Sequence, residues 1–197
     1  FFLAINLGYL TVNIFAYLDI RRYIKEIRLF RIKNLLSSNM YPPITIIVPA
    51  HNEEPTIIDT VLSLQAINYP QFEIIVVSDG STDATIEKLI GHFQLKEDFR
   101  LHKGQLPTAE INGIYSLKRL NLIVIEKAQG GKADAVNAGL NASNFPLVAV
   151  IDADSILEQD ALIKATYPFL VDSRVVAVGG IIRLANGCRI VNGDLQE

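Results

Sequence analysis

Short apolar runs alternate with amphipathic stretches along residues 43–197. Four runs are rich in Ile, Val or Leu and end in polar or glycine-rich residues: Ile44–Val48, Ile74–Val77, Leu122–Ile125 and Leu147–Ile151. Runs of this length with little polar alternation are typical of parallel strands that are buried on both faces. A fifth run begins at Val175 and predicts a further strand.

The stretches between these runs predict helices at about 55–67, 82–90, 131–140 and 161–170. Alternation of strands with helices predicts an α/β fold, with a mainly parallel, Rossmann-like sheet and helices on both of its faces. Residues 93–119 break this rhythm, because they are polar, contain glycine and proline, and have no clean period. We therefore predict a loop or insertion there.

The N-terminal segment has a different character, because residues 1–18 carry no charge. A membrane-spanning helix needs about 20 apolar residues, so this run is close to the length that a membrane helix requires. A signal peptide carries its positive charges before the apolar run, but here they follow it. The order of charges therefore favours a membrane helix over a signal peptide. Six basic residues follow within residues 21–33: Arg21, Arg22, Lys25, Arg28, Arg31 and Lys33.

Lys and Arg beside a membrane segment mark the cytoplasmic side. The sequence thus predicts a partial membrane helix at 1–20, a basic juxtamembrane helix and linker at 21–42, and a globular domain at 43–197. We expect that domain to lie on the cytoplasmic face of the cell membrane.

The charge of the chain bears on the ligands that it can bind, and its cysteine content bears on disulfide bonds. The chain has 18 basic and 21 acidic residues, and without the six cations, Asp19 and Glu26 the remainder has 12 basic and 19 acidic residues. An acidic globular part argues against nucleic acid as a partner, although a metal ion and a local cation still allow one bound nucleotide. The single cysteine, Cys188, excludes a disulfide framework and fits a reducing cytosol.

Candidate chemistry collects where the predicted strands end, because ligands of open α/β sheets bind outside the carboxyl ends of the strands. Asp152 and Asp154 are two residues apart after the fourth run, so both carboxylates can face the same side. Two oxygen ligands with open positions suit Mg²⁺ or Mn²⁺ shared with substrate phosphates. The alternative to a metal site is that one of the two aspartates caps a helix and the other is a solvated carboxylate in a loop.

Other strand ends offer further candidates. Lys132 follows Gly130-Gly131 at a predicted helix start, where a phosphate can bind; a P-loop is excluded because Ala133 follows the lysine. The alternative is a glycine turn with an exposed lysine.

Asp79 can accept hydrogen bonds from a base or a ribose, or it is a turn residue. His51 is expected to make a backbone contact in its loop.

Four segments, in this order and spacing, resemble the inverting family-2 glycosyltransferases of GT-A fold: Ile47–Glu54, Val77–Asp83, Gly130–Gly139 and Ile151–Ser155. The Gly130–Ala135 stretch and the preceding hydrophobic segment are most similar to processive synthases of β-linked polysaccharides, such as poly-N-acetylglucosamine, hyaluronan and cellulose. The resemblance implies metal-dependent transfer of a hexose, N-acetylglucosamine, from a UDP-sugar to a polysaccharide or lipid/glycan acceptor.

The resemblance also implies residue roles for holding the donor. Pro49, Ala50 and Glu53 would hold the uridine, and Asp79 would read the uracil. His51 stands where the family often has tyrosine, so its role in nucleotide binding carries over only in part.

The same family pattern implies roles at the phosphates. Lys132 would lie near the diphosphate, and Asp152 would contact the nucleotide side. Asp154 would ligate Mg²⁺ or Mn²⁺ together with Asp152.

The general base of this family lies in a Glu-Asp or Thr-Glu-Asp motif, followed in processive members by Gln-x-x-Arg-Trp, and neither occurs here. We therefore expect the base beyond Glu197, predict no catalytic residue in this chain, and expect no complete turnover by it alone. Two alternatives remain. A nucleotidyltransferase would carry a glycine-rich basic loop after the first strand, and a non-catalytic, membrane-tethered nucleotide-binding domain would lack the base altogether.

Overall fold

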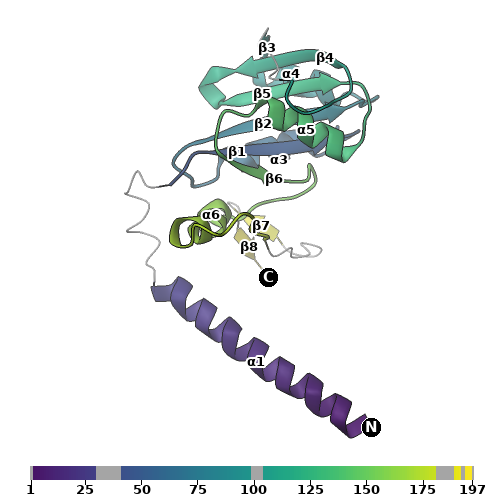
Figure 1. Cartoon of the computed structure of the whole chain (residues 1–197). Helices are drawn as coiled ribbons and strands as arrows, with labels where there is room; N and C mark the ends of the chain where they lie inside the picture. Colours follow the sequence, from purple (N-terminus) through teal and green to yellow (C-terminus); the bar gives the residue numbers. More distant parts are fainter. Residues whose placement is uncertain (1, 30–40, 99–103, 181–188, 192–193, 197) are drawn as a thin grey trace. The chain divides into compact units, whose positions relative to one another are not determined.

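The structure is a computed structural model that describes residues 2–29, 41–98, 104–180, 189–191 and 194–196 (Figure 1). The chain divides into two units, Phe1–Met40 and Tyr41–Glu197, and each is described by itself.

Among the described residues, the first unit contains the helix α1 (Phe2–Leu29), and its apolar side chains from Phe2 to Ile20 are exposed wherever the structure describes them. Within the described residues, no helix combines the length and the apolar character needed to cross a membrane. The predicted crossing at residues 1–20 is corrected accordingly: Asn6 and Asn13 interrupt the apolar run, and charged residues begin at Asp19.

The second unit is built on a six-stranded sheet of order β3-β4-β5-β2-β1-β6. Its four parallel strands are β1 (Ile44–Ala50), β2 (Phe72–Asp79), β5 (Leu122–Lys127) and β6 (Leu147–Val150). β1 pairs with β2 and β6, and β2 pairs with β5. The four strands predicted from the apolar runs are therefore confirmed.

Two antiparallel strands extend the sheet beyond β5. These are β3 (Lys96–Glu97) and β4 (Ile111–Leu117), and the short helix η1 (Lys118–Leu120) leads from β4 into β5. The predicted loop over 93–119 is therefore wrong where β4 runs. β4 is only half-buried and its pairing shifts register between Ile111 and Gly113, so its sequence lacks the long apolar run of an inner strand.

The predicted strand at Val175 is also wrong, because residues 175–180 have no regular structure. The C-terminal strands β7 (Arg189–Val191) and β8 (Asp194–Gln196) form a separate antiparallel pair.

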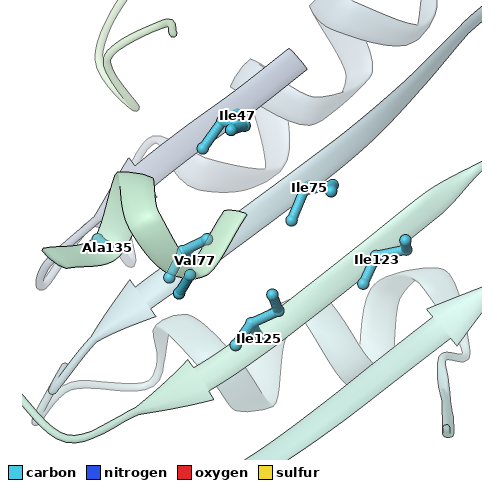
Figure 2. Close-up of a cluster of buried hydrophobic side chains, with 7 residues drawn as sticks. Ile47, Ile75, Val77, Ile123, Ile125 and Ala135 are labelled. Carbon is cyan, nitrogen blue, oxygen red and sulfur yellow. The ribbon is translucent and has the colours of Figure 1, made fainter. Parts of the chain in front are cut away.

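Helices cover both faces of the six-stranded sheet, as predicted. α5 (Lys132–Ala142) lies on one face and α3 (Ile57–Gln65) and α4 (Thr85–Phe93) lie behind the other (Figure 1). α6 (Ala161–Val171) follows β6 in the chain. Figure 2 shows the core between α5 and the sheet, which includes Ile47, Ile75, Val77, Ile123 and Ile125 of the strands and Ala135 and Ala138 of α5.

The packing of α5 on β1 is unusually close because Gly139 has no side chain. A Cβ at Gly139 would lie 2.6 Å from Cγ2 of Ile47, where no side chain fits. This contact holds α5 on the sheet. Because α5 follows β5 in the chain, the N-terminus of α5 lies near the carboxyl end of that strand.

Candidate functional site

The parallel pairing brings the four predicted strand ends to one edge of the sheet. The register places Ala50 beside Ser78 and Asp79 beside Lys127 at that edge. The loops after β1, β2, β5 and β6 therefore share one rim, as the sequence predicts for a ligand site.

The loops after β1 and β2 are joined by hydrogen bonds between backbone and side chains. Asn52, at φ 57°, donates its backbone N–H to Ser81 Oγ at 3.1 Å, and its side-chain oxygen accepts the N–H of Thr82 at 2.7 Å. Glu53 donates its N–H to Thr85 Oγ1 at 3.0 Å. These bonds fix the loop that carries the predicted uridine contacts.

The predicted uridine-binding residues lie together at the start of this loop. Ala50 is buried, Pro49 and Glu53 are half-buried, and His51 is exposed. His51 Nδ1 lies 2.8 Å from the carbonyl oxygen of Asp79. Because a carbonyl only accepts hydrogen bonds, His51 donates from Nδ1, and the predicted backbone contact of His51 is confirmed.

Asp79 ends β2 and is 5% exposed. Its carboxylate accepts the N–H groups of Gly130 at 2.9 Å and Gly131 at 2.6 Å, together with the ammonium of Lys127. The amides just before α5 therefore bind the chain's own carboxylate and are not free for a phosphate. Asp79 Oδ2 accepts one bond from the described residues, and its contact with uracil stays a prediction.

The turn at Gly80 completes this arrangement. Gly80 has φ +66°, and its N–H donates to the carbonyl of Lys127 at 2.9 Å. A Cβ at Gly80 would lie 2.9 Å from the backbone nitrogen of Gln129. Only glycine allows the β2 turn to approach the segment after β5 this closely.

Lys127 and Asp134 belong to the site, although the sequence pattern does not predict them. The Lys127 side chain is fully buried, and its ammonium contacts both Asp79 Oδ1 and Asp134 Oδ1 at 2.5 Å. Asp134, in the first turn of α5, also accepts the N–H of Ala109 at 3.0 Å. The available signal was a charged residue ending a buried apolar strand, since such a charge needs a partner.

Burial and pairing act in opposite directions on this cluster. Burial raises the pKa of Asp79, but the hydrogen bonds from Lys127, Gly130 and Gly131 outweigh it, so the pKa lies below its ordinary value. Burial lowers the pKa of Lys127, but the bonds to Asp134 and Asp79 outweigh it and raise the pKa. Both groups are therefore charged at neutral pH.

Lys132 and Asp152 connect the loop after β5 with the end of β6. The Lys132 ammonium lies 2.5 Å from Asp152 Oδ1, and both side chains are more than half exposed. Asp152 and Asp154 are exposed on either side of buried Ala153, whose carbonyl accepts the hydroxyl of Thr60 at 2.5 Å. This places both predicted metal ligands at the surface of the rim.

The carboxylates fit a cation that is shared with a ligand. Among the described residues, no three His, Cys, Asp or Glu side chains gather as a metal cage, and the Asp154 side chain has no hydrogen-bond or ion-pair partner there. Mg²⁺ keeps several waters and binds through one or two carboxylates plus phosphates. Asp152 and Asp154 match that mode and do not match an all-protein cage.

Comparison with known proteins identifies the protein family of this chain. The family model of glycosyl transferase family 2 matches residues 45–192, and the chain belongs to this family.

Two curated relatives are poly-beta-1,6-N-acetyl-D-glucosamine synthases. The Staphylococcus epidermidis protein is 29% identical over 153 residues and that of Staphylococcus aureus strain COL is 31% identical over 155 residues. Each alignment covers 78% of this chain, which spans 31% of either relative's length. The solved structure of the mannosyltransferase PcManGT from Pyrobaculum calidifontis, in complex with GDP-Man and Mn²⁺, is similar at TM-score 0.58 and 25% identity. That match covers 82% of this chain and 44% of PcManGT.

The lowered pKa of Asp79 predicts a loss of stability in acid. A group with a depressed folded-state pKa stabilises the protein above its unfolded pKa, here 3.8, and this contribution is lost as pH falls through the folded-state pKa. Asp79→Asn should cost about 3–5 kcal/mol at neutral pH, because it leaves Lys127 short of a carboxylate. It should also flatten the fall in the free energy of unfolding below about pH 5.

Denaturant unfolding at a series of pH values checks this prediction. Asp59→Asn, which removes an exposed carboxylate of α3, serves as the control and should keep the steep acid dependence. If the free energy of unfolding depended on pH equally in Asp79→Asn and in the unaltered chain, the lowered pKa of Asp79 would be contradicted.

Proposed function

We propose that this chain is the donor-binding part of a glycosyltransferase that transfers a hexose, N-acetylglucosamine, from a UDP-sugar with inversion. The acceptor is a growing polysaccharide or a lipid/glycan. The observation that carries the proposal is the Lys132–Asp152 contact, which joins the Gly130-Gly131-Lys132 segment, here called the glycine loop, to the end of β6 beside exposed Asp154. One cation and two carboxylates at a sheet rim suit a metal-bound diphosphate.

The donor would lie across the four strand ends. Pro49, Ala50 and Glu53 would contact the uridine, because their loop is held against the loop after β2. Asp79 would accept from the uracil through the lone pair that its glycine and lysine contacts leave on Oδ2. His51, exposed beside Asp79, would line the same nucleotide-binding surface.

The phosphates would lie between α5 and β6. Asp152 and Asp154 would hold Mg²⁺ or Mn²⁺, which when bound stabilises the negative charge on the departing diphosphate. Lys132 would turn from Asp152 to the phosphate oxygens as a second positive charge. Because the Lys132–Asp152 pair is exposed, exchanging it for phosphate contacts costs about 1 kcal/mol or less.

The transfer itself would be one displacement at the anomeric carbon. The acceptor oxygen forms a bond to that carbon, the bond to the diphosphate oxygen breaks with its electron pair leaving on the diphosphate, and a general base takes the hydroxyl proton. Location of that base beyond Glu197 stays a prediction.

The relatives support the choice of sugar and metal. Two curated relatives are named as synthases of poly-β-1,6-N-acetylglucosamine, and the similar mannosyltransferase structure contains Mn²⁺. That structure contains GDP-Man, so the base of the nucleotide is the point to test first.

Calorimetric titration with UDP, GDP and ADP, with and without Mn²⁺, tests the donor and the metal. We expect UDP to bind more tightly than GDP or ADP, and Mn²⁺ to strengthen UDP binding at least about tenfold, or ~1.4 kcal/mol. Asp154→Ala should abolish the effect of Mn²⁺, because it removes a metal ligand.

Asp160→Ala, which removes a carboxylate next to α6, is the matched control and should keep the effect of Mn²⁺. Binding of UDP that is no tighter than that of GDP and ADP would refute the donor assignment. Unchanged dependence on Mn²⁺ in Asp154→Ala would refute the metal site.

We also propose that residues 1–33 attach the protein to the cytoplasmic face of the cell membrane. The exposed apolar side chains between Phe2 and Ile20 are followed by six cations within residues 21–33. Each cation near an anionic lipid surface contributes about 1 kcal/mol. Replacing the six cations by Gln should therefore reduce binding to vesicles containing phosphatidylserine at least about tenfold. Equal binding of the two proteins in flotation assays would contradict the proposal.

A further inference from the structure

The buried lysine at the end of β5 has a complete set of partners. An ammonium has three donors, and Lys127 directs them to Asp79, to Asp134 and to the carbonyl of Ala128. Its side chain is fully buried. Lys127 is therefore not placed to contact a nucleotide directly.

The partners of Lys127 hold three separate segments. Asp79 ends β2 and binds the amides of Gly130 and Gly131. Asp134 binds the amide of Ala109, in the segment before β4. Without the ammonium, two carboxylates would share a largely buried site, and like charges this close repel. The arrangement of all three segments thus depends on one cation.

The glycine loop has little freedom within this arrangement. A Cβ at Gly130 would lie 2.6 Å from the Asp134 carboxylate, and Gly131 has φ +91°. Both amides are fixed on Asp79, and Lys132 is the next residue in the chain. The direction in which the Lys132 side chain leaves the backbone is therefore set by Asp79 and Asp134, and through them by Lys127.

We propose that Lys127 is a positioning residue of the donor site, which acts on the sugar nucleotide through the Gly130-Gly131-Lys132 loop. This inference rests on the proposed function, because it assigns Lys132 to the donor's phosphates. Lys127 orders the loop before the ligand arrives, so that Lys132 reaches the phosphates without a further loss of backbone entropy.

A double-mutant cycle on UDP binding in the presence of Mn²⁺ tests the route through Lys132. Lys132→Ala should weaken binding about tenfold in the unaltered chain. In a Lys127→Met background the same substitution should weaken binding less than about twofold, because Lys132 is then already misplaced. An equal factor in both backgrounds would overturn the proposal, since a lysine that only stabilises the fold gives independent effects.

Two further variants serve as a control and as a replacement for Lys127→Met. Lys164→Met removes a lysine that also bridges two carboxylates, Glu158 and Asp160, but does so at the surface, and it should leave UDP binding unchanged. If Lys127→Met does not fold, Asp134→Asn replaces it, because Lys127 then keeps Asp79. Asp134→Asn should reduce the effect of Lys132→Ala, and retention of the full effect would overturn the proposal.

Amide hydrogen exchange without ligand separates this inference from the proposed function. Gly130 and Gly131 amides should exchange at least about tenfold faster in the folded Lys127 or Asp134 variant, because their acceptor is no longer fixed. Unchanged protection would overturn the positioning role, whether or not the chain binds UDP. Absence of nucleotide binding by the unaltered chain, with faster exchange in the variants, would refute the proposed function and leave Lys127 as the residue that orders the loop.

Discussion

The buried ion cluster of Lys127 with Asp79 and Asp134 is the interaction on which the rim of this sheet depends. A charge in an apolar environment is costly unless it is paired and hydrogen-bonded. Here the ammonium uses its three donors, and the two carboxylates bind backbone amides from two other segments. This requirement for pairing holds the end of β2, the Gly130-Gly131 segment and the segment before β4. Apolar contacts stabilise the sheet beneath them.

This cluster changes the meaning of the glycine loop before α5. A helix N-terminus beside two glycines is ordinarily a site for an external anion. In this chain the amides of Gly130 and Gly131 already bind the carboxylate of Asp79. The Lys132 side chain, which lies beside Asp152 at the surface, is the positive group that we propose for a phosphate. In the function proposed above, a side chain and a metal would therefore recognise the diphosphate, and the backbone would support them.

The sheet and its helices could largely be predicted from the sequence, because inner parallel strands are continuous apolar runs and the helices between them are amphipathic. β4 could not, since a half-buried strand with Gly113 and Ser116 lacks that pattern. The rim position of Asp152 and Asp154 followed from their spacing after a strand. The pairing of Lys127 with Asp79 did not, because it joins residues 48 positions apart whose contact arises from the β2–β5 register.

We propose that the four strand ends form one metal–nucleotide site. Paramagnetic broadening of the amide NMR signals by Mn²⁺ in the presence of UDP tests it most directly. If the four strand ends form this site, the signals of Asp152–Asp154, Lys132 and Gly80 should broaden first. The signals near Glu73 and Asn144, which contact each other where the strands begin, should stay sharp. Broadening centred on Glu73 and Asn144, or spread evenly over the sheet, would show that Mn²⁺ and UDP do not bind at these strand ends.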